Sequence, residues 1–406
     1  MSRTSFIYLN TKHYDGTVFV TQIADWLRLY SENGITFMYF HQFYGKEFFR
    51  TDWKKSHLEK IRTVIPQIEN VSITLPEKFF FPRVNAYLLN RIINTKCKGS
   101  DRVVIFSRML YGKEIKILKR LSSKEIVFIY DARGASKAEH EYDLTKKGMN
   151  KVQLQKLLNH ISEVERDAVV NADRIFCVSN VLMKYLSQEY GVNEDKFFIY
   201  PCLSDSNKFY YSQTLRENMR EKLGYNSSAH VYLYSGGLKN KYHLVGETLE
   251  FLNNVAKNDK EARFLFLSKD EYDENELLKD YSYLKGKITV RCVPNEEVVN
   301  YLNAADFGLL FRDNVIMNNV ASPSKFAEYI LCGLPTIISE GVGDYSELCV
   351  KENLGIKVKD FKLTEADANR LIENDFSREK IAFFGSQNLS KQSRLPQILM
   401  EFKRYQ

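Results

Sequence analysis

The stretch FGLLFRDNVIMNNVASPSKFAEYILCGLPTIISEGVGD, residues 307–344, holds one complete unit of the fold. A short apolar run is followed by a polar loop, a helix-length segment and a second apolar run, PTIIS. Ser322 is the predicted N-cap of the helix, and Pro323 is its predicted first residue. Gly333 is expected to end the helix before Pro335 opens the next strand. Alternation of this kind is typical of parallel sheets covered by helices on both faces.

The same alternation extends along the rest of the chain. Strands are predicted at 5–10, 36–40, 71–75, 103–107, 126–130, 174–179 and 197–201, and then at 230–235, 263–268, 287–292, 307–311, 335–339 and 355–359. Two such series predict an α/β fold of two doubly wound, Rossmann-like domains that face a cleft. The first domain is expected to comprise residues 1–204 and the second residues 205–385. Residues 386–406 are expected to form a C-terminal helix, with the first domain as a candidate for the domain on which it packs.

The composition excludes several classes of protein. The chain has 406 residues, of which 19 are Gly and 8 are Pro, so collagen-like and low-complexity chains are excluded. No apolar run approaches the roughly 18–20 residues that span a bilayer. The first sixteen residues contain no long apolar segment, so a signal peptide is not expected. The six cysteines never occur as C-x-x-C, which indicates a reducing cytoplasm and no structural zinc site.

The positive charge is confined to one half of the chain. Residues 1–200 carry 31 Lys or Arg and 22 Asp or Glu, whereas residues 201–406 carry 27 and 29. The excess is concentrated in 54–62, 83–98 and 112–124, where apolar residues recur at helical spacing. These segments are either solvated faces of amphipathic helices or a surface for anionic lipid head groups or an anionic acceptor. No nucleic-acid-binding motif accompanies the charge, and no nucleic-acid partner is expected.

The helix predicted after Pro323 has the features of an anion site. The backbone amides of Ser324 and Lys325 would point out of its N-terminus, with the Lys325 ammonium nearby. Glu328 follows about one turn later, where a carboxylate can accept hydrogen bonds from sugar hydroxyls. The alternative is an exposed ion pair between Lys325 and Glu328, three residues apart on one helix face.

Residues 322–337, SPSKFAEYILCGLPTI, resemble the nucleotide-binding helix of retaining GT-B glycosyltransferases of the family 4 type, which include sucrose and mannosyl transferases. Three further segments resemble parts of the same family in the same order. They are the first strand–turn–helix at 11–27, the end of the first domain at 174–202, and the Gly-rich loop YSGGLKNKYH at 234–243. The pattern is most similar to bacterial enzymes that build surface polysaccharides.

The resemblance implies transfer of a sugar from a nucleotide diphosphate sugar to a hydroxyl of a glycan or lipid-linked glycan, with retention of configuration. The product would belong to O-antigen, capsule or lipopolysaccharide synthesis, made by a cytoplasmic enzyme that can lie at the anionic inner-membrane surface. No metal or other cofactor is expected, because no D-x-D sequence and no histidine cluster occurs. The implied donor-binding residues are Gly236, Gly237, Ser322, Pro323, Ser324, Lys325 and Glu328, and the implied catalytic residues are Arg312, Lys241, Lys325 and Asp131.

The implied acceptor and sugar side lies in the first domain. The turn Asp15–Gly16–Thr17 precedes the first helix, and Arg108 follows a predicted strand. The segment YDARGASKAEHEYD, 130–143, is interpreted either as a simple polar loop or as an acceptor loop. Its candidate residues, besides Asp131, are Arg133, Glu139 and His140.

Three positions depart from the family pattern: Val320, and Gly237 and Tyr242 where the family's Gly-rich loop often has an Arg and a Lys. The family has a second glutamate eight positions before Glu328, where this chain has Val320. Asn318 and Asn319 are candidate replacements, and Lys241 and Arg312 are candidate substitutes for the cations of the family's Gly-rich loop. Two alternatives stay open: a nucleotide-sugar epimerase of the same fold, and a non-catalytic glycosyltransferase-like subunit, for which these departures are the best evidence.

Overall fold

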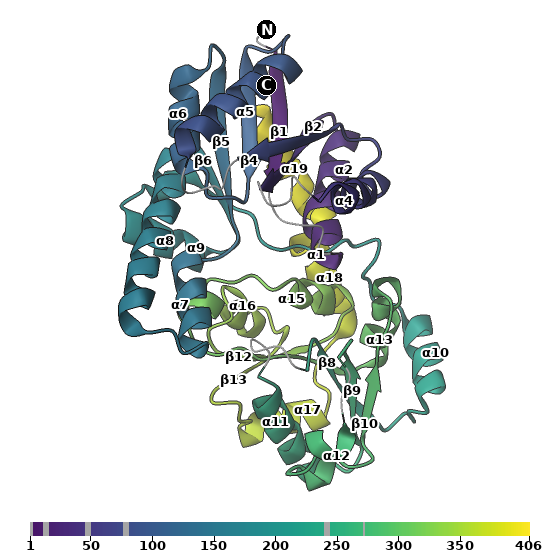
Figure 1. Cartoon of the computed structure of the whole chain (residues 1–406). Helices are drawn as coiled ribbons and strands as arrows, with labels where there is room; N and C mark the ends of the chain where they lie inside the picture. Colours follow the sequence, from purple (N-terminus) through teal and green to yellow (C-terminus); the bar gives the residue numbers. More distant parts are fainter. Residues whose placement is uncertain (1–2, 11–15, 45–49, 76–80, 239–243, 271–272) are drawn as a thin grey trace. The chain divides into compact units, whose positions relative to one another are not determined.

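The computed structural model describes residues 3–10, 16–44, 50–75, 81–238, 244–270 and 273–406 (Figure 1). It divides into two compact units: Met1–Pro201 with Leu395–Gln406, and Cys202–Arg394. Each unit contains one parallel sheet, and the strand orders are β3-β2-β1-β4-β5-β6-β7 in the first and β10-β9-β8-β11-β12-β13 in the second. The predicted pair of doubly wound α/β sheets is therefore confirmed.

Every strand run predicted from the sequence is a strand of the structure, with ends that differ by a few residues. β-branched and aromatic residues fill these runs, and most of their side chains are buried. The strands of the first unit are β1 Thr4–Asn10, β2 Phe37–Tyr44, β3 Asn70–Leu75, β4 Arg102–Ser107, β5 Glu125–Ala132, β6 Arg174–Cys177 and β7 Phe197–Ile199. Those of the second are β8 His230–Ser235, β9 Ala262–Leu267, β10 Ile288–Arg291, β11 Phe307–Leu310, β12 Thr336–Ser339 and β13 Gly355–Val358.

The helices of the first unit connect successive parallel strands. A π-helical turn, Val20–Ala24, joins two α-helical pieces into one continuous helix after β1. The α-helices are α1 Thr17–Phe19, α2 Asp25–Glu32, α4 Thr51–Val64, α5 Pro82–Lys96, α6 Gly112–Leu121, α7 Ser136–Lys146, α8 Lys151–Asn171 and α9 Asn180–Tyr190. Along the series, α5 packs against α6 and α6 packs against α8.

The last residues of the chain complete the core of the first unit. α19, Lys391–Lys403, places the fully buried ring of Phe402 within 5.1–6.2 Å of five other rings (centroid to centroid). These rings belong to Phe6, Tyr30, Phe37, Phe106 and Phe176. Just beyond the helix, the Tyr405 carbonyl accepts hydrogen bonds from the Thr4 hydroxyl at 2.6 Å and from Arg102 at 3.1 Å.

The second unit has its own core and its own buried ion-pair cluster. Asp306, which precedes β11, accepts from Arg216 at 2.5 Å, from Arg220 at 3.0 Å and from the Val231 amide at 2.8 Å. These contacts tie α10 to the start of the sheet. The helices of this unit are α10 Gln213–Leu223, α11 Val245–Asn258, α12 Glu274–Leu277, α13 Val298–Ala304, α14 Ile316–Asn319, α15 Ser324–Leu331, α16 Tyr345–Lys351, α17 Glu365–Ile372 and α18 Arg378–Asn388. Only the first four residues of α19, 391–394, belong to it. No described helix is both long and apolar enough to cross a membrane.

Candidate functional site

The strand order of the second unit defines a point where the connections reverse direction. After β8 the chain forms β9 and β10 on one side of β8, and it then returns to form β11 on the other side of β8. Ligands of open parallel sheets bind outside the carboxyl ends of the strands at such a point. Gly236 and Gly237 follow β8 there, and Arg312 follows β11. The fold therefore brings these three predicted site residues to one edge of the sheet.

The backbone of Arg312 is fixed by the neighbouring strand. Its amide donates to the Ser339 hydroxyl at 2.9 Å, and the same hydroxyl donates to the Arg312 carbonyl at 3.0 Å. Ser339 ends β12, which pairs with β11, and the Arg312 side chain is partly exposed. Ser339 was not among the predicted site residues, although its place at the end of a predicted strand was available as a signal.

The helix α15 starts one residue later than predicted. Pro323 is its N-cap and Ser324 is its first residue, and among the residues that the structure describes no side chain accepts from the Ser324 or Lys325 amide. Ser322 does not cap the helix, because its buried hydroxyl accepts from the Cys202 amide at 3.0 Å and bonds the Tyr345 hydroxyl at 2.8 Å. The prediction of Ser322 as N-cap and Pro323 as first helical residue is wrong. Without a side-chain cap, the first amides of α15 keep their capacity to bind an anion.

The position of α15 depends on Gly308 and Gly333. A Cβ at Gly308 in β11 would overlap the ring of Tyr329, so glycine allows the helix to lie close to the sheet. Gly333 adopts φ +62°, the left-handed conformation that ends helices. The predicted end of the helix is thereby confirmed, and α15 is held with its N-terminus at the carboxyl edge of β11.

Lys325 and Arg312 make this edge electropositive. Burial, and after it the positive charge of Arg312, lower the pKa of Lys325 to about 8, while the charge of Glu328 opposes the shift. The two positive charges repel each other, and burial removes much of the water around Lys325. A bound anion would stabilise both charges. The geometry thus favours a negatively charged ligand beside the N-terminus of α15.

Glu328 lies one turn along the same helix in a partly buried position. Burial raises the pKa of its carboxyl group, whereas Lys325, a hydrogen bond from the Ser324 hydroxyl and Lys391 lower it. Lys391 is buried at the start of α19, more than sixty residues away in the chain, and no sequence pattern had marked it. The carboxylate is held among cations and can accept hydrogen bonds from a hydroxylated ligand.

The loop between β11 and α15 has no carboxylate at the position of the family's other glutamate. Val320 is buried there. The Asn318 side-chain amide donates to the Asp313 carbonyl at 2.9 Å, and its backbone carbonyl accepts from the Gly343 amide at 3.3 Å. Asn318 therefore stabilises the loop and its contact with the segment after β12.

The two glycines after β8 differ in their bonding. The Gly236 amide donates to the Leu267 carbonyl at 2.9 Å, so it continues the sheet towards β9. The Gly237 carbonyl accepts from the Tyr234 hydroxyl at 3.0 Å. Gly236 still belongs to the hydrogen-bond ladder between β8 and β9, and Gly237 is the first residue after it. Lys241 lies outside the described residues.

In the first unit, a buried carboxylate joins two of the predicted acceptor-side arginines. Asp131, 1% exposed at the end of β5, contacts Arg108 Nε at 2.9 Å and Arg133 Nε at 2.8 Å. The Arg133 guanidinium also lies over the Tyr200 ring, 4.5 Å from its centroid. Both arginines are only slightly exposed. This arrangement makes Asp131 a residue that positions two guanidinium groups at the carboxyl edge of the sheet.

The same cluster contacts the helix that follows β1. Arg108 donates to the Gln22 side-chain oxygen at 3.2 Å and to its backbone carbonyl at 2.8 Å. Gln22 lies in the π-helical turn, five residues after Thr17, the first residue of α1, and six after Gly16 (φ +68°). Asp15 lies outside the described residues. The strand ends of β1, β4 and β5 are thus connected through Arg108.

The interpretation of residues 130–143 as a polar loop is wrong. β5 continues to Ala132, and α7 begins at Ser136, so Glu139 and His140 are exposed helix residues. Glu165 of α8 accepts from the Ser136 amide at 2.6 Å and the Lys137 amide at 3.4 Å. This remote carboxylate caps the helix, a contact that local sequence does not reveal.

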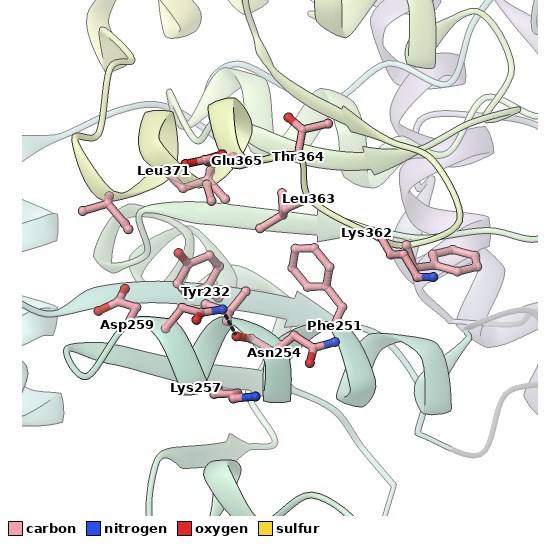
Figure 2. A pocket seen from close by; sticks show the side chains of 15 residues that line it. Tyr232, Phe251, Asn254, Lys257, Asp259, Lys362, Leu363, Thr364, Glu365 and Leu371 are labelled. Atoms are coloured by element: carbon pink, nitrogen blue, oxygen red, sulfur yellow. Dashed lines mark hydrogen bonds between the residues drawn. The ribbon is translucent and has the colours of Figure 1, made fainter.

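A separate cavity of about 520 Å³ lies in the second unit between α11 and α17. Figure 2 shows Phe251 and Asn254 on the α11 side and Thr364, Glu365 and Leu371 on the α17 side. None of the predicted site residues lines it. Phe311, the residue before Arg312, packs on Phe251 and Phe361, with centroids 5.1 and 5.4 Å away. In the described ranges, no group of three or more His, Cys, Asp or Glu side chains could hold a metal ion.

Comparison with known proteins gives a result for the fold alone. No family model and no curated protein sequence matches the chain. A glycosyltransferase from Rickettsia africae matches with TM-score 0.66 and 13% identity, over 100% of this chain and 99% of that one. Anabaena HepE in complex with UDP and glucose matches with TM-score 0.63 and 13% identity, over 98% and 99%. WaaG, a glycosyltransferase involved in lipopolysaccharide biosynthesis, matches with TM-score 0.60 and 15% identity, over 97% of each. With its two parallel α/β sheets, the chain has the GT-B fold.

Proposed function

We propose that this protein is a glycosyltransferase that moves a sugar from a nucleotide diphosphate sugar to a hydroxyl acceptor. The observation that carries the proposal is the cationic edge of the second unit, where Arg312 and Lys325 meet the uncapped N-terminus of α15 at the topological switch point. Anabaena HepE, which shares the fold, was crystallised with UDP and glucose.

The second unit would hold the donor. The Ser324 and Lys325 amides, the Gly237 amide, Lys241 and the Arg312 guanidinium would stabilise the negative charge that grows on the diphosphate as the glycosidic bond breaks. Preorganised stabilisation of developing charge is often the largest catalytic contribution. Glu328 would accept hydrogen bonds from the ribose hydroxyls. Ser322 and Pro323 would hold the entry to α15.

The first unit would hold the acceptor. Arg108 and Arg133, positioned by Asp131, lie at the carboxyl edge of its sheet and would contact an anionic or glycan acceptor. Gly16 and Thr17 would lie beside the transferred sugar, and Glu139 and His140 on α7 would meet the outer part of the acceptor. Transfer would retain the anomeric configuration, with a diphosphate oxygen taking the acceptor proton on the same face.

The biological setting follows from the same resemblance. The acceptor would be a glycan or lipid-linked glycan of the bacterial surface, as WaaG acts in lipopolysaccharide biosynthesis. The enzyme would work in the cytoplasm, with its basic first unit at the anionic membrane surface. No resident metal or cofactor is part of the proposal.

The donor site can be tested by calorimetry with UDP, GDP, ADP and CDP in the absence of metal. We expect one-to-one binding of one nucleotide, and a loss of about tenfold or more in affinity for Glu328→Ala, because a carboxylate that accepts hydrogen bonds from hydroxyls is removed. Glu373→Ala, at an exposed helix end of the same unit, is the matched control and should bind as the wild type does. A folded protein that binds none of the four would favour the non-catalytic subunit, and release of an epimerised sugar without acceptor would favour the epimerase.

The lowered pKa of Lys325 predicts a pH dependence of nucleotide binding. With a pKa of about 8 in the free protein, the ammonium is mostly charged at pH 7 and mostly neutral at pH 9. Affinity for the diphosphate should therefore fall by up to about tenfold over this range, with proton uptake on binding near pH 8. Lys325→Arg keeps its charge throughout and should give a flat profile. An equally steep profile in that variant would contradict the assignment of the pH dependence to Lys325.

A further inference from the structure

The outer face of α5 carries large apolar side chains that the fold leaves uncovered. Phe81, just before the helix, is 52% exposed, Val84 is 45% exposed and Tyr87 is 62% exposed. They follow one another at three-residue spacing, so they lie on one side of the first two turns. Single exposed apolar residues are ordinary, but three adjacent ones on one helix face are typical of an interaction surface.

Exposed cations lie along the same helix and along its neighbour α6. Arg83, Arg91 and Lys98 are exposed on or just after α5, and Lys116 and Arg120 are exposed on α6, which packs beside it (Figure 1). Among the residues that the structure describes, no carboxylate forms an ion pair with any of these five. α5 contains no acidic residue, and the single acidic residue of α6, Glu114, is buried. The α5–α6 face, as we call these eight residues, therefore presents apolar and positive groups without exposed negative ones.

This combination fits an anionic lipid surface. Aromatic side chains enter the boundary between head groups and acyl chains, while Lys and Arg attract anionic head groups without needing a fixed geometry. A protein partner would require carboxylates placed opposite particular arginines, whereas the cations here are spread over two helices. Neither α5 nor α6, both of them within the described residues, exposes a carboxylate that would repel an anionic membrane.

We propose that the α5–α6 face docks this protein on an anionic bilayer, with Phe81, Val84 and Tyr87 entering the interface. The inference deepens the proposed function, on which it rests, by naming the docking surface for a lipid-linked acceptor. α5 follows β3, so its first turn lies at the carboxyl edge of the sheet, the edge that also carries Arg108 and Asp131. Docking through Phe81–Tyr87 would bring this edge to the membrane, where the sugar end of a lipid-linked acceptor is found.

The test is co-sedimentation of the full chain with vesicles of phosphatidylcholine that contain 0 or about 30% phosphatidylglycerol. We expect binding only with the anionic lipid, weakened by added salt. Phe81→Ser/Tyr87→Ser should lower the partition coefficient by about tenfold, because two apolar side chains no longer enter the interface. Arg83→Gln/Arg91→Gln/Lys116→Gln/Arg120→Gln should lower it by more than about a hundredfold, since each cation near the surface contributes roughly fivefold.

Matched controls separate this face from net charge and from general hydrophobicity. Lys147→Gln/Lys151→Gln/Lys156→Gln/Lys184→Gln removes four exposed cations elsewhere in the first unit, and Val152→Ser removes an apolar side chain that is more exposed than any of the three. Both should bind vesicles nearly as the wild type does. Equal losses in the control and face variants, or wild-type binding in the face variants, would overturn the proposal. If this face bound a protein saturably and the chain did not bind vesicles, the lipid proposal would be overturned in favour of a protein partner.

Nucleotide calorimetry on the same variants keeps this inference distinct from the proposed function. The face variants should bind nucleotide as the wild type does, because the α5–α6 face and the donor residues belong to different units. If the protein binds vesicles but no nucleotide, the proposed membrane surface is supported and the proposed donor site is contradicted.

Discussion

Replacing Lys325 with alanine should lower the rate of sugar transfer by about a hundredfold to a thousandfold, the size of effect seen when one preorganised stabiliser of developing charge is removed. The ammonium is largely desolvated beside Arg312, so its attraction for a diphosphate is weakened less by water than that of a surface lysine. The rate per enzyme should be measured at saturating donor, once calorimetry has named the nucleotide and an acceptor has been found.

Two further variants make the result specific. Arg312→Ala should cause a loss of similar size, and the double variant should lose less than the product of the two, because both side chains act on one leaving group. Lys380→Ala, at an exposed position of α18, should keep wild-type turnover. Normal turnover in Lys325→Ala and in Arg312→Ala would contradict the assignment of the donor site to this edge.

Replacing Phe402 with alanine should destabilise the first unit by about 3–5 kcal/mol, the usual cost of removing a buried aromatic ring. The ring is fully buried and packs against five aromatic rings from β1, α2, β2, β4 and β6. Met400→Ala is a matched control two residues earlier on the same helix, where the side chain is 67% exposed, and it should change stability by less than about 0.5 kcal/mol. Denaturant unfolding followed by fluorescence of Trp26 and Trp53, both in the first unit, measures the difference. Similar midpoints for the two variants would show that α19 is not part of this core.

The strands could be predicted because their signal is local. Runs such as VVIFS at 103–107 and FGLLF at 307–311 are short, apolar and rich in β-branched or aromatic residues, and both became central strands. The end of α15 at Gly333 was equally readable, since a left-handed residue is needed there. These features depend on neighbours within a few positions.

What the sequence could not reveal are the contacts between distant residues. The hydroxyl of Ser322 is bound by Cys202 and Tyr345, so it is not free to cap α15 as its local sequence suggests. In the same way, residues after Arg133 look like a polar loop until Glu165 caps them as a helix. Tertiary partners of this kind override local preference.

The closure of the first unit by residues 395–406 has a consequence for synthesis on the ribosome. Residues up to Pro201 emerge from the ribosome before Phe402 and the Tyr405 carbonyl, which complete their core, have been translated. At about 5–20 residues per second, the intervening segment takes on the order of 10–40 s to make. During that time the N-terminal part carries an open apolar site between its strands and α2. Newly made N-terminal segments should therefore be the form of this protein that chaperones bind most readily.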